Sequence, residues 1–509
     1  MRIYEGFKDS SVSDLVVDEG RVHFAAPCGD SLFSMWWQFA LQSDGPGRVG
    51  CVWERTNEVL GGGGLGAAVP VYHDGDRWRR VPTRSCHYEP EEHRLRFTVP
   101  VQAGLTPVAY CYPYGLEQIN RMIRQARQHP DIHVRKIGES ERGLPFRLVE
   151  CGHGPFHVWV TARHHSGEMT GSYVLEGFLQ EALQRPKLLD HVTLHVAPAM
   201  DVDGVAGGMY GKDRQPRDFN RDYCTTPCRP EVAALMQAAQ WVGQVDMFLD
   251  LHAPTAGDHT FLVQVAESMT TADYWNREWE FGRQVEALAP ASCPCRVQDL
   301  SRQSLNWSNE NMLQTATRYF HSQFEALSMT LETTYHRSWN GKLVGPQGWH
   351  ALGRALLRAV GVQAGAYRAP GVSQIELPPS LIQRLPNWWH AHAPVKMEAR
   401  EKAAGLEVQS DSADSYCWVM SKKVLQAQGP EALFAYRLQG RVKELTVTAK
   451  GFDGVQDLPT GTWSSETVEC RGGGEWQSGR VAHKEREYRL LFRVRGLEGK
   501  LEVRAGGEE

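Results

Sequence analysis

Two histidines and two glutamates occur in a pattern that could bind a metal ion and use it in catalysis. His165 and Glu168 form a His-x-x-Glu motif, His252 follows further along the chain, and Glu332 lies in a later TLE segment. Two imidazoles and one carboxylate form the His₂Glu ligand set of catalytic zinc sites, whose fourth position stays open. A second carboxylate beside the zinc can act as general base and acid. A lone His-x-x-Glu is weak evidence, because most histidines are surface or core residues.

The segment from 212 to 221 adds groups that could bind a substrate. Lys212 and Arg214 precede the sequence DFNR, which ends in Asn220 and Arg221. An arginine fork matches a carboxylate with two hydrogen bonds, so the C-terminal carboxylate of a peptide would fit this pair. Asp218 could accept the free N–H of a ligating imidazole and so fix its orientation. On its own, Asp-x-Asn-Arg would more often be a solvated loop.

These residues follow segments that we expect to be buried strands. The expected strands are FHVWVTA (156–162), HVTLHVAPA (191–199), VDMFLDL (245–251) and LSMTLE (327–332). The expected helices that alternate with them span 116–128, 171–184, 231–242, about 275–288 and 349–360. This alternation predicts a mixed, mostly parallel sheet flanked by helices on both faces.

Ligands of such sheets bind beyond the carboxyl ends of the strands. His165, Glu168, His252 and Glu332 all fall there, and this coincidence strengthens the interpretation as a metal site. We expect one Zn²⁺ per chain, bound by the two histidines and Glu168, with Glu332 as the catalytic residue. His164 should be structural, because neighbours on an extended segment point in opposite directions.

The sequence of 509 residues changes character twice, which predicts three domains. Residues 1–115 should form an antiparallel β-sandwich, residues 116–371 the α/β domain, and residues 372–509 a β-rich accessory domain. The expected strands outside the α/β domain are HFAA, SLFSMWWQFAL and HRLRFTVPV before it, and SYCWVM, LFAYRLQG, KELTVTAKG, YRLLFRVRG and KLEVRAG after it, with LPPSLIQRLP as a linker.

Composition excludes several classes of partner. The chain has 55 Lys+Arg, 60 Asp+Glu and a net charge of −5, so no basic surface for nucleic acid is expected. No apolar run approaches the roughly 20 residues that cross a bilayer. Eleven scattered cysteines, an odd number, do not resemble a disulfide framework, and a cytoplasmic location is therefore expected.

Five ordered motifs resemble the metallocarboxypeptidases of the carboxypeptidase A type, and more closely the cytosolic carboxypeptidase branch. They are ARHHSGE (162–168), PAMDVDG (198–204), DFNRDY (218–223), DLH (250–252) and TLETTY (330–335). The stretches YCYPYGLEQI (110–119) and IGESERGLPFRLVECG (137–152) resemble the branch's junction between a β-domain and the peptidase domain, so the similarity covers about 1–370. The resemblance implies a zinc peptidase that acts on peptide or protein C-termini.

The resemblance also implies roles for individual residues. His165, Glu168 and His252 would bind zinc, and Glu332 would be the general base or acid. Asn220 and Arg221 would hold the substrate's terminal carboxylate. Asp218 would stand behind His165.

The sequence departs from the family pattern at several positions. The family usually has an arginine nine residues before the motif asparagine, where this chain has Gly211, and Lys212 and Arg214 are the two candidates to replace it. Arg318 lies close to a position where the cytosolic branch carries a basic residue, which predicts a preference for Glu or Asp at the substrate's C-terminus. Tyr319 and Tyr335 are the candidates for an aromatic residue that covers the substrate.

Other functions remain open from the sequence. The same zinc site could serve an amidase that acts on N-acyl amino acids or cell-wall peptides. Alternatively, the chain could be a catalytically silent protein that binds peptide or carbohydrate. Cys224, Cys228, Cys293 and Cys295 could form a structural zinc site, although their spacing is unusual for one.

Overall fold

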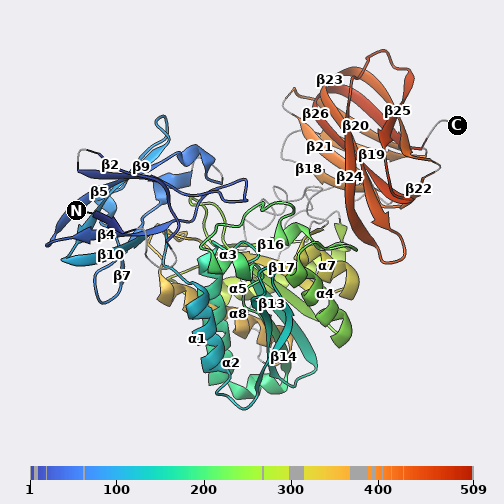
Figure 1. Ribbon diagram of the computed structural model, residues 1–509. Helices are drawn as coiled ribbons and strands as arrows, with labels where there is room; N and C mark the ends of the chain where they lie inside the picture. The colour runs from blue at the N-terminus through green and yellow to red at the C-terminus, as the bar shows by residue number, and fades with distance from the viewer. Residues whose placement is uncertain are drawn as a thin grey trace.

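The three-dimensional structure is a computed structural model. It describes residues 2–4, 10–18, 20–60, 64–265, 269–296, 314–366, 388–392, 397–403, 405–413, 415–427 and 429–506. Two small sheets lie at the N-terminal end of the chain, a seven-stranded sheet with helices in the middle, and a nine-stranded sheet at the C-terminal end (Figure 1). The expected linker and the predicted boundary at 372 lie outside the described residues. Among these residues, no helix is both long and apolar enough to cross a membrane.

The N-terminal region consists of two sheets of five strands that share one aromatic core. The first has the order β1 (Arg2–Tyr4), β4 (Gln38–Ser43), β10 (Gly104–Ala109), β6 (Val71–His73), β7 (Trp78–Arg80). The second has the order β2 (Ser13–Asp18), β3 (Arg21–Ala25), β5 (Gly47–Glu54), β9 (Arg94–Val101), β8 (His87–Glu89). All neighbouring strands are antiparallel except β3 and β5. Phe24 of one sheet packs against Phe39 of the other, with ring centroids 4.9 Å apart.

The predicted N-terminal strands are only partly correct. In SLFSMWWQFAL the strand β4 begins at Gln38, and Trp36 and Trp37 precede it as fully buried core residues. Their burial excludes them as an exposed platform for sugars. Strand β9 shows the expected alternation, with Leu95, Phe97, Val99 and Val101 buried.

The central domain has the expected mixed sheet. Its order is β11 (Ile132–Glu139), β12 (Pro145–Gly152), β14 (Val192–Ala197), β13 (Phe156–Ala162), β15 (Met247–His252), β17 (Leu327–Glu332), β16 (Phe261–Gln264). The four strands from β14 to β17 are mutually parallel, whereas the pairs at both edges are antiparallel. Strands β15 and β17 are buried along their whole length, as expected for strands covered on both faces.

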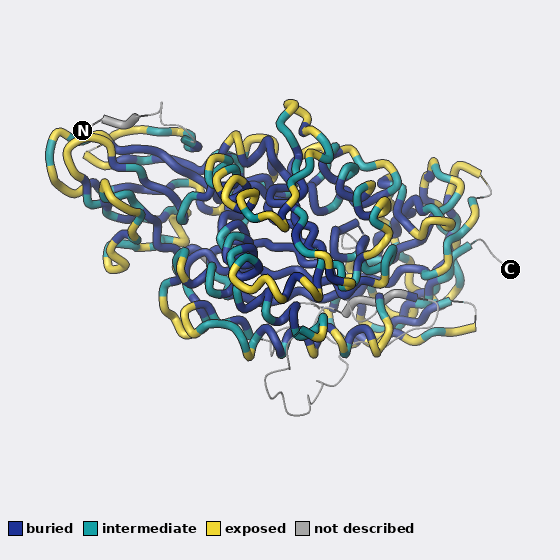
Figure 2. Tube along the Cα trace, turned by 90° about the horizontal axis from the view of Figure 1, so that it is seen from below, coloured by how far each residue is buried: buried dark blue, intermediate teal, exposed yellow. Residues whose placement is uncertain are grey.

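Helices cover both faces of this sheet. They are α1 (Leu116–Ala126), α2 (Met169–Gln184), α3 (Val202–Ala206), α4 (Pro230–Val242), α5 (Ala272–Leu288), α7 (Ala316–Phe324) and α8 (Pro346–Gln363). Figure 1 shows α1 and α2 on one side of the sheet and α4 and α7 on the other. Gly177 of α2 and Gly353 of α8 let the two helices approach closely, because a Cβ atom at either position would overlap the other helix's backbone. The trace is buried through the middle of the molecule (Figure 2).

The C-terminal domain is built on two long strands. It contains β18 (Trp388–His392), β19 (Met397–Lys402), β20 (Gly405–Asp411), β21 (Tyr416–Ser421), β22 (Leu425–Gln426), β23 (Glu431–Asp453), β24 (Leu458–Val468), β25 (Trp476–Ala482) and β26 (Glu487–Ala505). Four segments predicted as separate strands therefore form two continuous ones, β23 and β26. Gly440 and Gly499 pair at the same level, and neither has room for a Cβ atom, so the two strands cross closely there without interruption.

Candidate active site

The metal-binding candidates meet because three parallel strands end at the same level. Ala162, the last residue of β13, pairs with Leu251 of β15, and His252 pairs with Glu332 of β17. After Ala162 the chain turns sharply at Arg163, whose φ of 61° is left-handed. The buried guanidinium of Arg163 donates to the carbonyl of Ser166, which secures the following loop.

The three predicted ligands converge on one point inside the protein. Nδ1 of His165 lies 3.2 Å from Nδ1 of His252, and the Glu168 carboxylate contacts both nitrogens at 2.7 and 2.6 Å. All three side chains are buried, with at most 1% exposure. Two ring nitrogens that face each other with a carboxylate between them are a donor set for a metal ion, and the described atoms fit a His₂Glu site.

The second ring nitrogen of each candidate ligand histidine, Nε2, lies beside a different carboxylate. Nε2 of His165 lies 3.2 Å from Asp218, and Nε2 of His252 lies 2.8 Å from Asp250. Burial opposes ionisation of Asp218, but the neighbouring His165 and Arg221 hold its pKa well below the usual value. Carboxylates in this position fix the ring orientation, so that the two Nδ1 atoms face inward. The sequence placed Asp218 here through the resemblance and missed Asp250, although its position two residues before His252 on one strand puts both on the same face.

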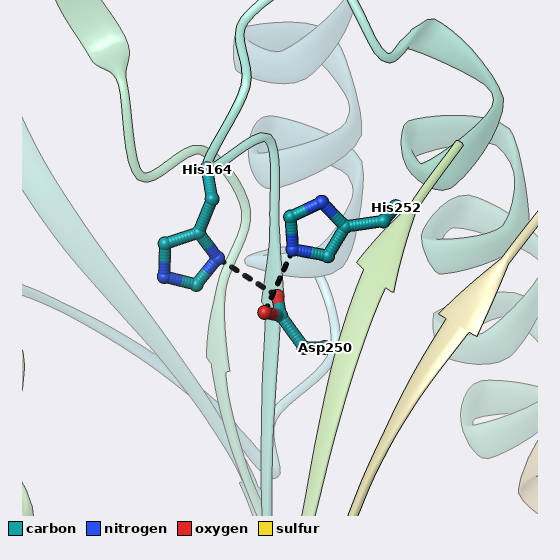
Figure 3. Close-up of side chains that lie close together, drawn as sticks. All are labelled: His164, Asp250 and His252. Atoms are coloured by element: carbon teal, nitrogen blue, oxygen red, sulfur yellow. Dashed lines mark hydrogen bonds and ion pairs between the residues drawn. The ribbon is translucent and has the colours of Figure 1, made fainter. Parts of the chain in front are cut away.

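His164 does not point away from the site, so that prediction is wrong. The segment is not extended there, because the left-handed turn at Arg163 redirects the chain. Figure 3 shows Asp250 between the rings of His164 and His252. Nδ1 of His164 lies 2.8 Å from Asp250, and its Nε2 lies 2.8 Å from the hydroxyl of Tyr223. His164 therefore orients the carboxylate that in turn orients His252.

Glu332 is placed beside the ligands but does not join them. Its side chain is 1% exposed, and its Oε2 atom has no hydrogen-bond partner within the described chain. Burial raises the pKa of Glu332 to about 7, against the opposing effect of His252. A buried carboxyl group that is poised near neutrality can both accept and donate a proton.

A small pocket connects these groups with the predicted substrate-binding residues. It is lined by His165, Lys212, Asn220, Arg221, His252, Val263, Thr315, Thr330 and Glu332. The Asn220 amide oxygen accepts from the backbone N–H of Ala316, and its amide nitrogen lies 3.2 Å from His252. Arg221 donates to the carbonyl of Asn220, so the two predicted carboxylate-binding residues lie together in the pocket wall.

The structure distinguishes between the two cations that might replace the missing arginine. Nζ of Lys212 lies 3.4 Å from Nδ1 of His165 and lines the pocket. Arg214 instead donates to Asp201 and Asp30 and does not line it. At Gly211, φ is 82° and a Cβ atom would lie 2.5 Å from Oγ of Ser166. An arginine therefore does not fit at this position.

Three other candidates lie away from the pocket. Arg318, in α7, donates to the carbonyl of Met269. Burial lowers the pKa of Arg318, while Asp457 of the C-terminal domain acts in the opposite direction. Tyr319 and Tyr335 are fully buried, and neither lines the described pocket. The cysteine site is not formed either, since the two potential metal groups found among the described residues contain no cysteine.

Comparisons with known proteins agree with this geometry. Residues 119–256 match the family described as zinc carboxypeptidase. The chain is 26% identical over 188 residues to cytosolic carboxypeptidase 2 of Xenopus tropicalis, covering 33% of this chain and 19% of that protein. It is 23% identical over 320 residues to cytosolic carboxypeptidase 6 of Caenorhabditis elegans, covering 52% of this chain and 70% of the relative. The chain thus spans about a fifth of the first relative's length.

A solved structure extends the comparison to the fold. A metallo-carboxypeptidase from Burkholderia cenocepacia superimposes with a TM-score of 0.63 at 22% identity. The alignment covers 72% of this chain and 99% of that chain. At this level of identity the similarity concerns the fold alone.

Proposed function

We propose that this protein is a zinc-dependent metallocarboxypeptidase that hydrolyses the C-terminal amide bond of peptides or proteins, because residues 119–256 match the zinc carboxypeptidase family. The observation that carries the proposal is the convergence of Nδ1 of His165, Nδ1 of His252 and the Glu168 carboxylate beside Glu332, whose Oε2 atom has no hydrogen-bond partner among the described residues. When bound, zinc supplies a Lewis acid that polarises a carbonyl group and makes water more acidic.

The residues of the chain divide the remaining work. Arg221 and Asn220 hold the terminal carboxylate of the substrate and thereby select the last amide bond. Lys212, whose ammonium group points at the metal ligands, stabilises negative charge that develops on the scissile carbonyl oxygen. Glu332 takes the proton of the attacking water at Oε2 and delivers it to the leaving amine.

The narrower proposal is a preference for acidic C-terminal residues, with Arg318 as its source. Arg318 is on the same helix end as Thr315, which lines the pocket, but its guanidinium contacts Met269. The lining residues Val263, Thr315 and Thr330 instead favour an uncharged side chain. Matched peptides ending in Glu or Leu distinguish these two preferences. If Arg318 contacts the acidic side chain of the substrate, Arg318→Ala should slow cleavage of the Glu peptide only. An unchanged ratio of the two rates would assign the pocket to uncharged residues.

Two other functions use the same residues. An amidase acting on N-acyl amino acids or cell-wall peptides would keep the zinc ligands, Glu332 and the carboxylate contact with Arg221. A catalytically silent binding protein would keep only the contacts that hold its ligand. The buried Oε2 atom of Glu332, which finds no hydrogen-bond partner in the part of the chain that the structure describes, supports the hydrolase over the binder, since a carboxyl group in such a position is unfavourable for stability.

A cytoplasmic location is part of the proposal. All eleven cysteines are free in the structure, and seven of them are buried. Unpaired buried thiols are typical of proteins from a reducing compartment.

The test combines metal content with peptide cleavage. Purified protein should contain about one zinc ion per chain and should release C-terminal residues from a mixed peptide library, with loss of activity in the presence of a chelator. Zinc without peptide cleavage, but with cleavage of N-acyl amino acids, would favour the amidase. Zinc without either activity would favour the binding protein, and absence of zinc would refute the proposal.

A further inference from the structure

One short segment of the central domain carries several of the groups that surround the candidate metal ligands. Within residues 217–226, Asp218 contacts His165, Asn220 and Arg221 line the pocket, and Tyr223 contacts His164. Most of this segment lies outside regular helices and strands. Other contacts must therefore hold it in place.

Those contacts come in part from the C-terminal domain. Strands β23 and β24 form a hairpin whose tip reaches the central domain beside α7. The backbone N–H of Thr225 donates to the carbonyl of Pro459 at 3.0 Å, and the Thr226 hydroxyl donates to the carbonyl of Thr460 at 2.9 Å. Gln323 of α7 donates to the carbonyl of Gln456 at 2.8 Å. Figure 1 shows the C-terminal domain on the side of the molecule where α4 and α7 lie.

Apolar side chains of the hairpin join the core of the central domain. Phe452 and Leu458 are buried and belong to the same hydrophobic cluster as Phe219 and Tyr223 of the segment. Trp418, Met420 and Leu491 of the C-terminal domain also belong to it. The contact is therefore a packed interface rather than a few surface hydrogen bonds.

Arg217 links the hairpin to the residue that follows Arg221. Its Nη2 atom donates to the carbonyl of Gly461 at 3.4 Å, and its Nη1 atom donates to Asp222 at 2.6 Å. Asp222 is fully buried and also accepts backbone hydrogen bonds from Cys228 and Arg229. A buried carboxylate needs its cation, so displacement of Arg217 would disturb the backbone next to Arg221.

Gly461 is the point where the hairpin approaches Arg217 most closely. Its φ is 88°, and a Cβ atom there would lie 2.9 Å from Nη2 of Arg217 and 3.1 Å from Sγ of Cys224. An alanine at this position would therefore press on the side chain that holds Asp222. The backbone conformation favours glycine, and an added Cβ atom would displace the Arg217 guanidinium.

We propose that the β23–β24 hairpin of the C-terminal domain is a positioning element for Asn220 and Arg221. It braces the 217–226 segment through Arg217 and Asp222 and so sets the place where the substrate carboxylate binds. The inference rests on the proposed function for the role of Asn220 and Arg221. It assigns a role to the C-terminal domain, for which the sequence predicted none.

The test compares Gly461→Ala with Gly474→Ala in the full-length protein. Gly474 also has a positive φ of 75°, but its nearest neighbour, Cγ of Gln439, would be 3.6 Å from an added Cβ atom. We expect Gly461→Ala to raise KM for peptides by about 10-fold with kcat changed less than about 2-fold, because the carboxylate site shifts while the reacting groups stay in place. Calorimetry with N-acetyl-leucine should show the same loss of affinity. Acetohydroxamate, which binds metal without a carboxylate, should bind as before.

Thr226→Val provides a second variant in case Gly461→Ala does not fold. Thr226 is exposed, and the change removes only the hydrogen bond to Thr460, so KM should rise by about 2- to 5-fold. Unchanged binding of N-acetyl-leucine by Gly461→Ala, or an equal loss in Gly474→Ala, would refute the inference.

The two proposals can fail separately. If the wild-type protein binds N-acetyl-leucine but cleaves no peptide, and Gly461→Ala weakens that binding, the hydrolase is wrong and the positioning role stands. If the wild-type protein cleaves peptides and Gly461→Ala binds N-acetyl-leucine normally, the hydrolase stands and the positioning role is wrong. A wild-type protein that binds neither compound refutes both.

Discussion

The candidate metal-binding cluster (His165, Glu168, His252 and the adjacent Glu332) and the 217–226 segment are held in place by different means. His252 and Glu332 are terminal residues of adjacent strands, and His165 and Glu168 follow a third strand directly, so sheet register fixes their spacing. The 217–226 segment is held by buried ion pairs and by another domain. Under the two proposals, the reacting groups depend on the core of one domain, whereas substrate recognition depends on the assembly of two.

This difference predicts which quantity each group of substitutions should change. Changes in the cluster should affect metal affinity or kcat and leave carboxylate binding intact. Changes at Asn220, at Arg221 or in the hairpin should affect KM. Sites without shared partners are expected to contribute independently.

The largest effect is expected for Glu332→Gln. The change keeps the shape of the side chain but removes the group that accepts and donates the proton, so kcat should fall by about 10³-fold. Zinc content, measured by mass spectrometry, should stay the same because the described residues that could together hold a metal ion do not include Glu332. Retention of activity would assign the base to another residue, and loss of zinc would place Glu332 among the ligands.

Lys212→Ala should have the next largest effect. Its ammonium group lies beside the metal ligands, and removal of a charge that stabilises the transition state should lower kcat by about 10²-fold. Arg214→Ala is the matched control, because Arg214 contacts Asp30 and Asp201 outside the pocket. We expect that control to lower the melting temperature and leave kcat within about 3-fold of wild type. The reverse result would show that Arg214 replaces the missing arginine.

Asp250→Asn tests the support behind His252. The amide cannot carry the charge that orients both His164 and His252, so zinc affinity should fall by about 10-fold in competition with a chelating dye. Asp246→Asn serves as control, since Asp246 precedes the same strand and contacts His157 instead of a ligand. Equal zinc affinity in both variants would mean that strand register alone orients His252.

The sequence predicted the cluster better than its surroundings. Strand ends are visible as apolar runs, and parallel strands must end at one edge, so the meeting of His165, His252 and Glu332 follows from local pattern. The contribution of His164 was missed because a single left-handed residue, Arg163, reverses the direction of its side chain. Such a conformation leaves no signal when the residue is not glycine.

Contacts between distant segments were also beyond sequence reasoning. Lys212 and Arg214 are both cations close to the position of the missing arginine, so the sequence does not choose between them. The ion pairs of Arg214 with Asp30 and Asp201 make that choice. Gly461 appears in the sequence as an ordinary turn glycine, although it lies against Arg217 in another domain. Of the strands of the C-terminal domain, only β21, β23 and β26 were recognised, and the continuity of β23 and β26 depends on the crossing of Gly440 and Gly499.

The smallest effect is expected when the metal is removed and the affinity for a carboxylate ligand is measured. If the 217–226 segment is held by Arg217, Asp222 and the hairpin, chelation should change the affinity for N-acetyl-leucine by less than about 3-fold while activity disappears. The segment contacts the cluster through Asp218, 3.2 Å from Nε2 of His165, and through the Asn220 amide, 3.2 Å from Nε2 of His252, in both cases on the side of the ring opposite to the metal donor. Calorimetry on metal-free and zinc-loaded protein measures this, with Arg221→Ala as the control that should abolish binding in both forms. A loss above 10-fold on chelation would show that the metal also orders the segment, and the division between cluster and segment would then be wrong.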